Sequence, residues 1–182
     1  GNEQDAMAMA DMFETIDTCP VPVIARVHGA ALGGGVGLCA VADVVIAESG
    51  ARFGFTETRL GVLPAVISPF VIAKIGESEA RALFPGGRRF DAIRALRIGL
   101  VHEVVPAGEA LARAMAIGEE IALRGPLAVR EAKRLLDLAS EVDLDAGLAA
   151  ELDASERVFA SEDMVEGATA FFDKRDPNYH GR

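Results

Sequence analysis

The sequence is poor in aromatic residues and in cysteine. It has no tryptophan, one tyrosine and two cysteines, Cys19 and Cys39. These cysteines form no CxxC pair and no ligand cluster with the three histidines, so we expect no metal site. We predict reduced thiols in a cytoplasmic protein, with Cys39 as a small buried residue rather than a nucleophile.

Positive charge and long apolar runs are also scarce. The chain carries 18 Lys and Arg against 28 Asp and Glu, a net charge of −10, which argues against a nucleic-acid partner. No apolar stretch is long enough to span a bilayer, and residues 1–19 lack the apolar segment of a signal peptide. The hydrophobic content of 51% excludes a disordered chain.

Residues 1–105 alternate between strand and helix signals. The β-branched runs predict strands at 23–27, 44–48 and 100–105, with a glycine-rich turn after the first. Periodicity and caps predict helices at 3–18, 34–42 and 68–74, another after Gly76, and one that Asp91 caps and that stops at Gly99. This alternation predicts an α/β core.

Residues 106–182 carry no strand signal. Their apolar spacing predicts four amphipathic helices, which we interpret as a packing or assembly region. Pro126 suits the first turn of the second helix, and Ser161 can cap the fourth. Lys174 and Arg175 are expected in the last turn of that fourth helix.

Three adjacent glycines, Gly33 to Gly35, stand at the predicted start of a helix. Glycine lets a ligand approach the backbone closely, and unpaired N–H groups there suit a negative charge that develops on oxygen. The segment is not a dinucleotide fingerprint, since Leu38 replaces its last glycine, and no Gly-Lys-Ser/Thr follows. The alternative is a tight strand-to-helix turn with close packing.

Five segments in order, PVIARVHGAALGGGVGL, ADVVIA, ARFGFTETRLGVLP, GLVHEVV and AFFDKRDPNY, resemble the crotonase superfamily of enoyl-CoA hydratases and isomerases. The resemblance implies a spiral of ββα turns with a helical C-terminal region. It also implies an acyl-CoA substrate, with coenzyme A as part of that substrate and no other cofactor. By resemblance, the Gly34 N–H donates to the thioester oxygen, and Gly33, Gly35, Gly37 and Pro64 belong to the substrate site.

The resemblance makes Glu57 the catalytic carboxylate; without it, Glu57 would read as a solvated surface charge. Many hydratases carry a second glutamate where this chain has Gly37. A single base can still deliver water and then protonate the α-carbon, or it can shuttle a proton as in Δ3,Δ2-enoyl-CoA isomerases. Asp43 is expected at the opposite end of the intervening helix, as a turn residue.

A narrower resemblance, to bacterial methylglutaconyl-CoA hydratases of leucine breakdown, rests on ARVHGAALGGGVGL and TETRLGVLPAVISPFV. It implies a substrate with a distal carboxylate, which Arg59 or Arg52 could neutralise; either could instead be a surface arginine. Phe171 and Lys174 match family positions that meet the adenine end of coenzyme A from a neighbouring subunit. Otherwise Phe171 packs among helices and Lys174 complements a helix end.

The resemblance further implies a homo-trimer or a dimer of trimers. Nothing in the chain matches the family loop that supplies the other oxyanion N–H, so we expect further sequence upstream. The competing hypothesis, from a different class of function, is a non-catalytic assembly subunit. A serine peptidase on a related fold is disfavoured, since Ser49 and Ser68 lie in no nucleophile motif.

Overall fold

The computed structural model describes residues 2–139 and 142–182 and divides into two compact units. Unit 1 comprises Gly1–Cys19 and Val23–Met115, and unit 2 comprises Pro20–Pro22 and Ala116–Arg182. The expected boundary after residue 105 precedes helix α5 (Ala110–Ala122), whereas the division between the units falls within it. Across the described ranges, no helix has the length and apolar character needed to cross a membrane.

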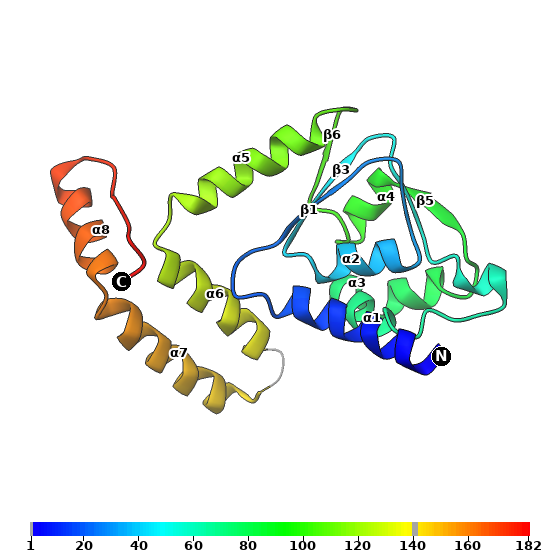
Figure 1. Cartoon of the computed structure of the whole chain (residues 1–182), viewed down its shortest axis with the longest axis horizontal. Coiled ribbons are helices and arrows are strands. Elements are labelled where there is room, and N and C mark those ends of the chain that lie inside the picture. Colours follow the sequence, from blue (N-terminus) through cyan, green and yellow to red (C-terminus); the bar gives the residue numbers. More distant parts are fainter. Residues whose placement is uncertain (1, 140–141) are drawn as a thin grey trace. The chain divides into compact units, whose positions relative to one another are not determined.

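Unit 1 contains two successive ββα turns, of which Figure 1 labels β1 and α2 in the first and β3 and α3 in the second. The first consists of β1 (Ile24–Val27), β2 (Ala30–Leu32) and α2 (Gly34–Val41). The second consists of β3 (Val44–Glu48), β4 (Arg52–Gly54), the 3₁₀ helix η1 (Glu57–Leu60) and α3 (Ser68–Leu83). Strand β1 pairs in parallel with β3, and β2 with β4. Each turn therefore adds one strand to each of two sheets, which confirms the spiral core.

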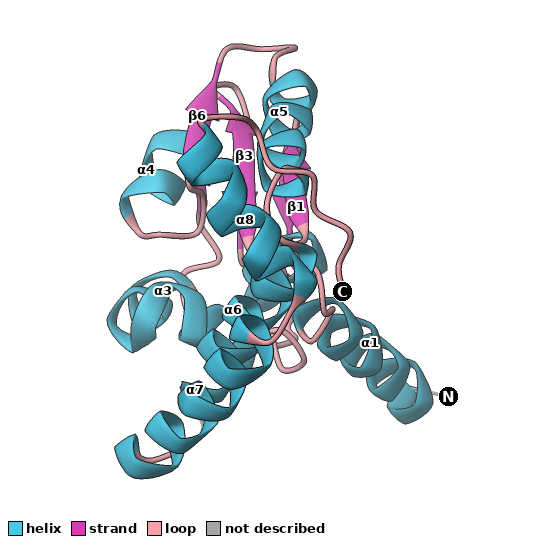
Figure 2. Cartoon of the chain, turned by 90° about the vertical axis from the view of Figure 1, so that its left-hand side faces the viewer, coloured by secondary structure: helices cyan, strands magenta, loops and turns pink. Residues whose placement is uncertain are grey.

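A third strand completes each sheet. Strand β6 (Glu103–Val105) pairs in parallel with β3, so that β1, β3 and β6 lie side by side (Figure 2). Strand β5 (Arg89–Asp91) pairs antiparallel with β4. The sequence prediction missed β2, β4 and β5 and placed their residues in turns and loops. Strands of three residues show no periodicity, and these three exist through pairing with one another across distant parts of the sequence, β2 with β4 and β4 with β5.

The core of unit 1 lies around α2, which is built from small and apolar residues that allow close packing. Helices α1 (Asn2–Asp17) and α3 pack against it, and Phe13 of α1 is only 1% exposed. Helix α3 is kinked at Gly76, whose φ of 78° and ψ of 157° are not helical, so the predicted break between two helices is confirmed. Helix α4 (Ala92–Arg97) begins as predicted, with the Asp91 carboxylate accepting from the Arg94 N–H at 2.8 Å.

Unit 2 is helical, as predicted, and contains α6 (Pro126–Ala139), α7 (Leu144–Phe159) and α8 (Glu162–Asp173). The Ser161 hydroxyl accepts from the Met164 N–H at 3.1 Å and caps α8. Lys174 and Arg175 lie after α8 rather than in its last turn, which corrects the prediction. Lys174 adopts a positive φ of 54° at the C-cap, which ends the helix there.

Candidate active site

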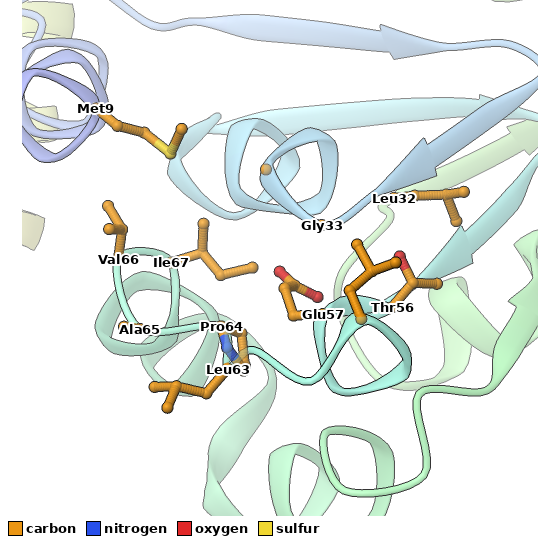
Figure 3. Close-up of a pocket in the computed structure, with 12 residues that line it drawn as sticks. Met9, Leu32, Gly33, Thr56, Glu57, Leu63, Pro64, Ala65, Val66 and Ile67 are labelled. Atoms are coloured by element: carbon orange, nitrogen blue, oxygen red, sulfur yellow. The ribbon is translucent and has the colours of Figure 1, made fainter. Parts of the chain in front are cut away.

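A cavity of about 290 Å³ opens in unit 1 between the first turn of α2, η1 and the segment that precedes α3. Figure 3 shows the Glu57 carboxylate pointing into it, with Gly33 on one side and Ile67 on another. Twelve residues line the cavity: Met9, Leu32, Gly33, Gly34, Thr56, Glu57, Leu60, Leu63, Pro64, Ala65, Val66 and Ile67. Four of the predicted site residues, Gly33, Gly34, Glu57 and Pro64, are among them.

Gly33 is the N-cap of α2, with φ 54° and ψ −121°. Its N–H donates to the Gly54 carbonyl at 3.0 Å, which ties the glycine loop to β4. Its carbonyl accepts from the N–H groups of Val36 and Gly37 at 2.9 and 3.3 Å. A residue with a side chain would be strained at this positive φ, so the sharp entry into α2 depends on glycine.

Gly34 is the first residue of α2, and within the described part of the chain its N–H has no acceptor. The first N–H groups of any helix lack partners inside the helix, and the helix dipole makes them favourable for negative charge. A Cβ added at Gly34 would meet nothing within 4 Å. Because Gly34 also lines the cavity, an oxygen atom bound there could accept a hydrogen bond from this amide.

The backbone around Glu57 holds its side chain in the cavity. The Val62 N–H donates to the Glu57 carbonyl at 3.2 Å, and Gly61, with φ 75°, ends η1. Oε2 of the carboxylate is buried and has no hydrogen-bond partner among the described residues. A buried polar atom without a partner costs free energy, and a catalytic role is one reason for a protein to keep such an atom. The sequence predicted Glu57 only through the family resemblance.

Gly37 lies in α2 behind Ile67, which lines the cavity, and is not itself a lining residue. A Cβ at this position would come within 2.5 Å of Ile67 Cγ2 and within 2.8 Å of Phe13 Cζ. Real Cβ atoms do not approach so closely, so α1 and the segment before α3 occupy the space of any larger side chain. The place where many hydratases carry a second glutamate is therefore filled by hydrocarbon.

The other predicted substrate residues of unit 1 lie outside the cavity lining. A Cβ added to Gly35 would lie 3.7 Å from the Ala31 Cβ, which is an ordinary van der Waals contact. Arg59 is exposed, and its Cγ lies 2.8 Å from a Cβ added at Gly87. Arg52 lines a different concavity of about 430 Å³, together with Arg89, Phe90, Asp91 and Arg94.

Phe171 and Lys174 belong to unit 2, near the end of α8. Phe171 is 79% exposed and meets Phe172 edge-on, with ring centroids 5.8 Å apart. The Lys174 N–H donates to the Phe171 carbonyl at 3.3 Å. Both residues therefore lie on a surface of unit 2, and their predicted role in binding coenzyme A stays a prediction.

Cys39 and Asp43, which were considered as possible reactive groups, have structural roles instead. Cys39 is buried in α2, and burial raises the pKa of its thiol to about 12, which keeps the thiol neutral. Asp43 follows α2, and its Oδ2 accepts from the Val23 N–H at 2.6 Å, as expected of a turn residue. Among the residues that the structure describes, no group of three or more His, Cys, Asp and Glu could hold a metal.

Residues 2–182 of the chain match the model of the enoyl-CoA hydratase/isomerase family. The chain is 37% identical over 194 residues to 2,3-dehydroadipyl-CoA hydratase of Escherichia coli, covering 100% of this chain and 76% of that protein. It is 36% identical over 165 residues to the short-chain-enoyl-CoA hydratase of Clostridium acetobutylicum, covering 90% of this chain and 63% of that protein. The chain therefore belongs to the enoyl-CoA hydratase/isomerase family.

Solved structures agree with this assignment. The crystal structure of an enoyl-CoA hydratase from Bacillus anthracis matches with a TM-score of 0.95 and 38% identity, covering 100% of this chain and 72% of that chain. This chain spans 57% of the length of the probable mitochondrial enoyl-CoA hydratase 2 of Arabidopsis thaliana and 76% of that of the Escherichia coli protein.

Proposed function

We propose that the chain takes part in the addition of water across the α,β-double bond of a CoA thioester. The observation that carries the proposal is one cavity lined by the Gly34 amide, which has no acceptor among the described residues, and by the buried Glu57 carboxylate oxygen, which has no partner. One group suits the thioester oxygen, and the other suits water and the proton that it loses.

In the proposed reaction, the thioester carbonyl oxygen accepts a hydrogen bond from the Gly34 N–H. Glu57 accepts a hydrogen bond from a water molecule and takes its proton as the oxygen bonds to the β-carbon. The electron pair of the double bond moves toward the carbonyl oxygen, where the Gly34 amide stabilises the enolate charge. Glu57 then returns the proton to the α-carbon, and the hydroxyacyl thioester results. Loss of one fixed oxyanion donor typically costs about 10²- to 10³-fold in rate.

A Δ3,Δ2-enoyl-CoA isomerase is the second candidate, and the packing at Gly37 favours it. Because hydrocarbon fills the position of the second glutamate, Glu57 is the only carboxylate that lines the cavity among the described residues. A single base suffices to remove a proton from one carbon and return it to another. The product separates the two reactions, since hydration yields a hydroxyacyl thioester and isomerisation a shifted double bond.

The test supplies crotonyl-CoA, 3-methylglutaconyl-CoA and a 3-enoyl-CoA side by side and identifies the products. Glu57→Gln should abolish turnover, and Glu109→Gln, at an exposed position outside the cavity, should not. Turnover that survives Glu57→Gln would overturn the assignment. Binding without any turnover in the unaltered protein would favour the non-catalytic assembly subunit.

Finer statements also stay proposals. A 3-methylglutaconyl substrate, with a role in leucine breakdown, would need Arg59 or Arg52 near the acyl group; since neither lines the cavity, an uncharged acyl group is the better-supported substrate. A homo-trimer or dimer of trimers is supported by large exposed apolar side chains on the helices of unit 2, including Leu136, Leu152 and Phe171 at 75%, 68% and 79% exposure. In such an assembly, Phe171 and Lys174 would meet the adenine end of coenzyme A. A cytoplasmic location is proposed on the two unpaired cysteines.

A further inference from the structure

The cavity wall beyond the reacting groups is hydrocarbon. Apart from the backbone of the two glycines, its polar groups are the Thr56 hydroxyl and the Glu57 carboxylate. The other side chains are apolar, namely Met9, Leu32, Leu60, Leu63, Pro64, Ala65, Val66 and Ile67. Within the described ranges, no lysine, arginine or histidine lines the cavity.

Arg59 and Arg52, either of which could have neutralised a distal carboxylate, lie outside the cavity lining. The side chain of Arg59 lies along Gly87, and Arg52 lines the separate concavity at β5. A second carboxylate in the cavity would therefore face Glu57 with no cation between them. At a spacing of about 6 Å and an effective dielectric constant of about 20, that repulsion corresponds to roughly a hundredfold in affinity.

We infer that the cavity selects acyl groups that are short and carry no charge of their own, and that Met9 and Leu63 are specificity-determining residues at its rim. This inference rests on the proposed function. Met9 and Leu63 are 44% and 69% exposed, whereas Ile67 at the inner wall is 3% exposed, which places the first two at the opening. A cavity of about 290 Å³ is at the small end for small-molecule sites, which suits a short acyl group.

The test compares the binding of butyryl-CoA and glutaryl-CoA by calorimetry. Both thioesters are saturated, so the comparison does not depend on turnover. Butyryl-CoA should bind at least about tenfold more tightly, because glutaryl-CoA brings its carboxylate near Glu57. Equal or tighter binding of glutaryl-CoA would overturn the inference. A protein that binds butyryl-CoA preferentially but turns over no enoyl-CoA would contradict the proposed function alone.

Variants at the rim test the cause of the selectivity. Leu63→Lys and Met9→Lys each place an ammonium group at the opening and should narrow the ratio of the two affinities by about tenfold. Leu63→Met keeps the size without the charge, and Leu111→Lys adds the same charge at a 54% exposed position on α5; both should leave the ratio unchanged. An unchanged ratio in both rim lysine variants would contradict the inference. So would a selective loss of glutaryl-CoA binding in Arg59→Met.

Discussion

The carboxylate of Glu57 lies directly against Gly33, so that a Cβ added to Gly33 would come within 3.3 Å of Glu57 Oε1. Gly33 also has a positive φ of 54°. The same glycine therefore allows the turn into α2 and leaves space for the catalytic carboxylate beside it. The two residues come from different ββα turns, and the pairing of β2 with β4 brings them together.

Alanine substitutions should separate the roles of Gly33 and Gly34. Gly33→Ala should lower the free energy of unfolding by about 1–3 kcal/mol, because it places a side chain at a strained φ and against Glu57. Gly34→Ala should leave the fold intact, since it meets open space, but its methyl group would stand in the cavity beside the amide. Denaturant unfolding measures the stability of each variant, and steady-state kinetics measures its activity. A stable Gly33→Ala variant would contradict the geometry.

Glu57→Gln should separate activity from stability. The carboxylate makes no hydrogen bond that the substitution would remove within the described structure, so the free energy of unfolding should change by less than about 1 kcal/mol. Turnover should fall by about 10²- to 10⁴-fold, because the amide cannot take a proton from water. Thermal unfolding and kcat measured on the same preparation decide this. A large loss of stability would mean that Glu57 has a structural role instead.

Two further glycines of α2 offer a matched comparison. Gly37→Ala should destabilise the fold by about 1–3 kcal/mol or more, because its Cβ would come within 2.5 Å of Ile67 and overpack the core. Gly35→Ala meets Ala31 at an ordinary 3.7 Å and should be neutral, or more stable by up to about 1 kcal/mol. Urea unfolding of the two variants gives the comparison. Equal stabilities would show that Phe13 and Ile67 yield at little cost.

The sequence predicted the long elements of unit 1 and the caps at Asp91 and Ser161, because these depend on local periodicity and on side chains a few residues away. It also placed the glycines at the start of a helix. It did not predict that Met9 and Val66 line the cavity, since that depends on how α1 and the segment before α3 pack around α2. The closure of the Gly37 position by Phe13 was likewise a consequence of packing between distant segments.

The acid stability of unit 2 should depend on Glu166. Arg175 donates to both of its carboxylate oxygens, at 2.6 and 2.8 Å, and the Asn178 N–H donates at 2.8 Å, so the pKa of Glu166 falls from 4.5 to about 2. A lowered carboxyl pKa stabilises the fold above the ordinary value, and this contribution is lost as the pH falls from 4.5 toward 2. Glu166→Gln should therefore lower Tm at pH 6, and the difference should shrink at pH 4 and again at pH 3.

Glu151→Gln, at an exposed carboxylate on α7, is the control for this pH dependence and should show no comparable trend. The ion pair itself is half exposed, with Arg175 and Glu166 side chains 42% and 25% accessible, so added salt should reduce the effect at pH 6 as well. A Tm difference that stays constant from pH 6 to pH 3 would show that the substitution acts through packing of the C-terminal segment against α8. In that case the hydrogen bonds from the His180 and Gly181 N–H groups to Asp163 would be the contacts to test next.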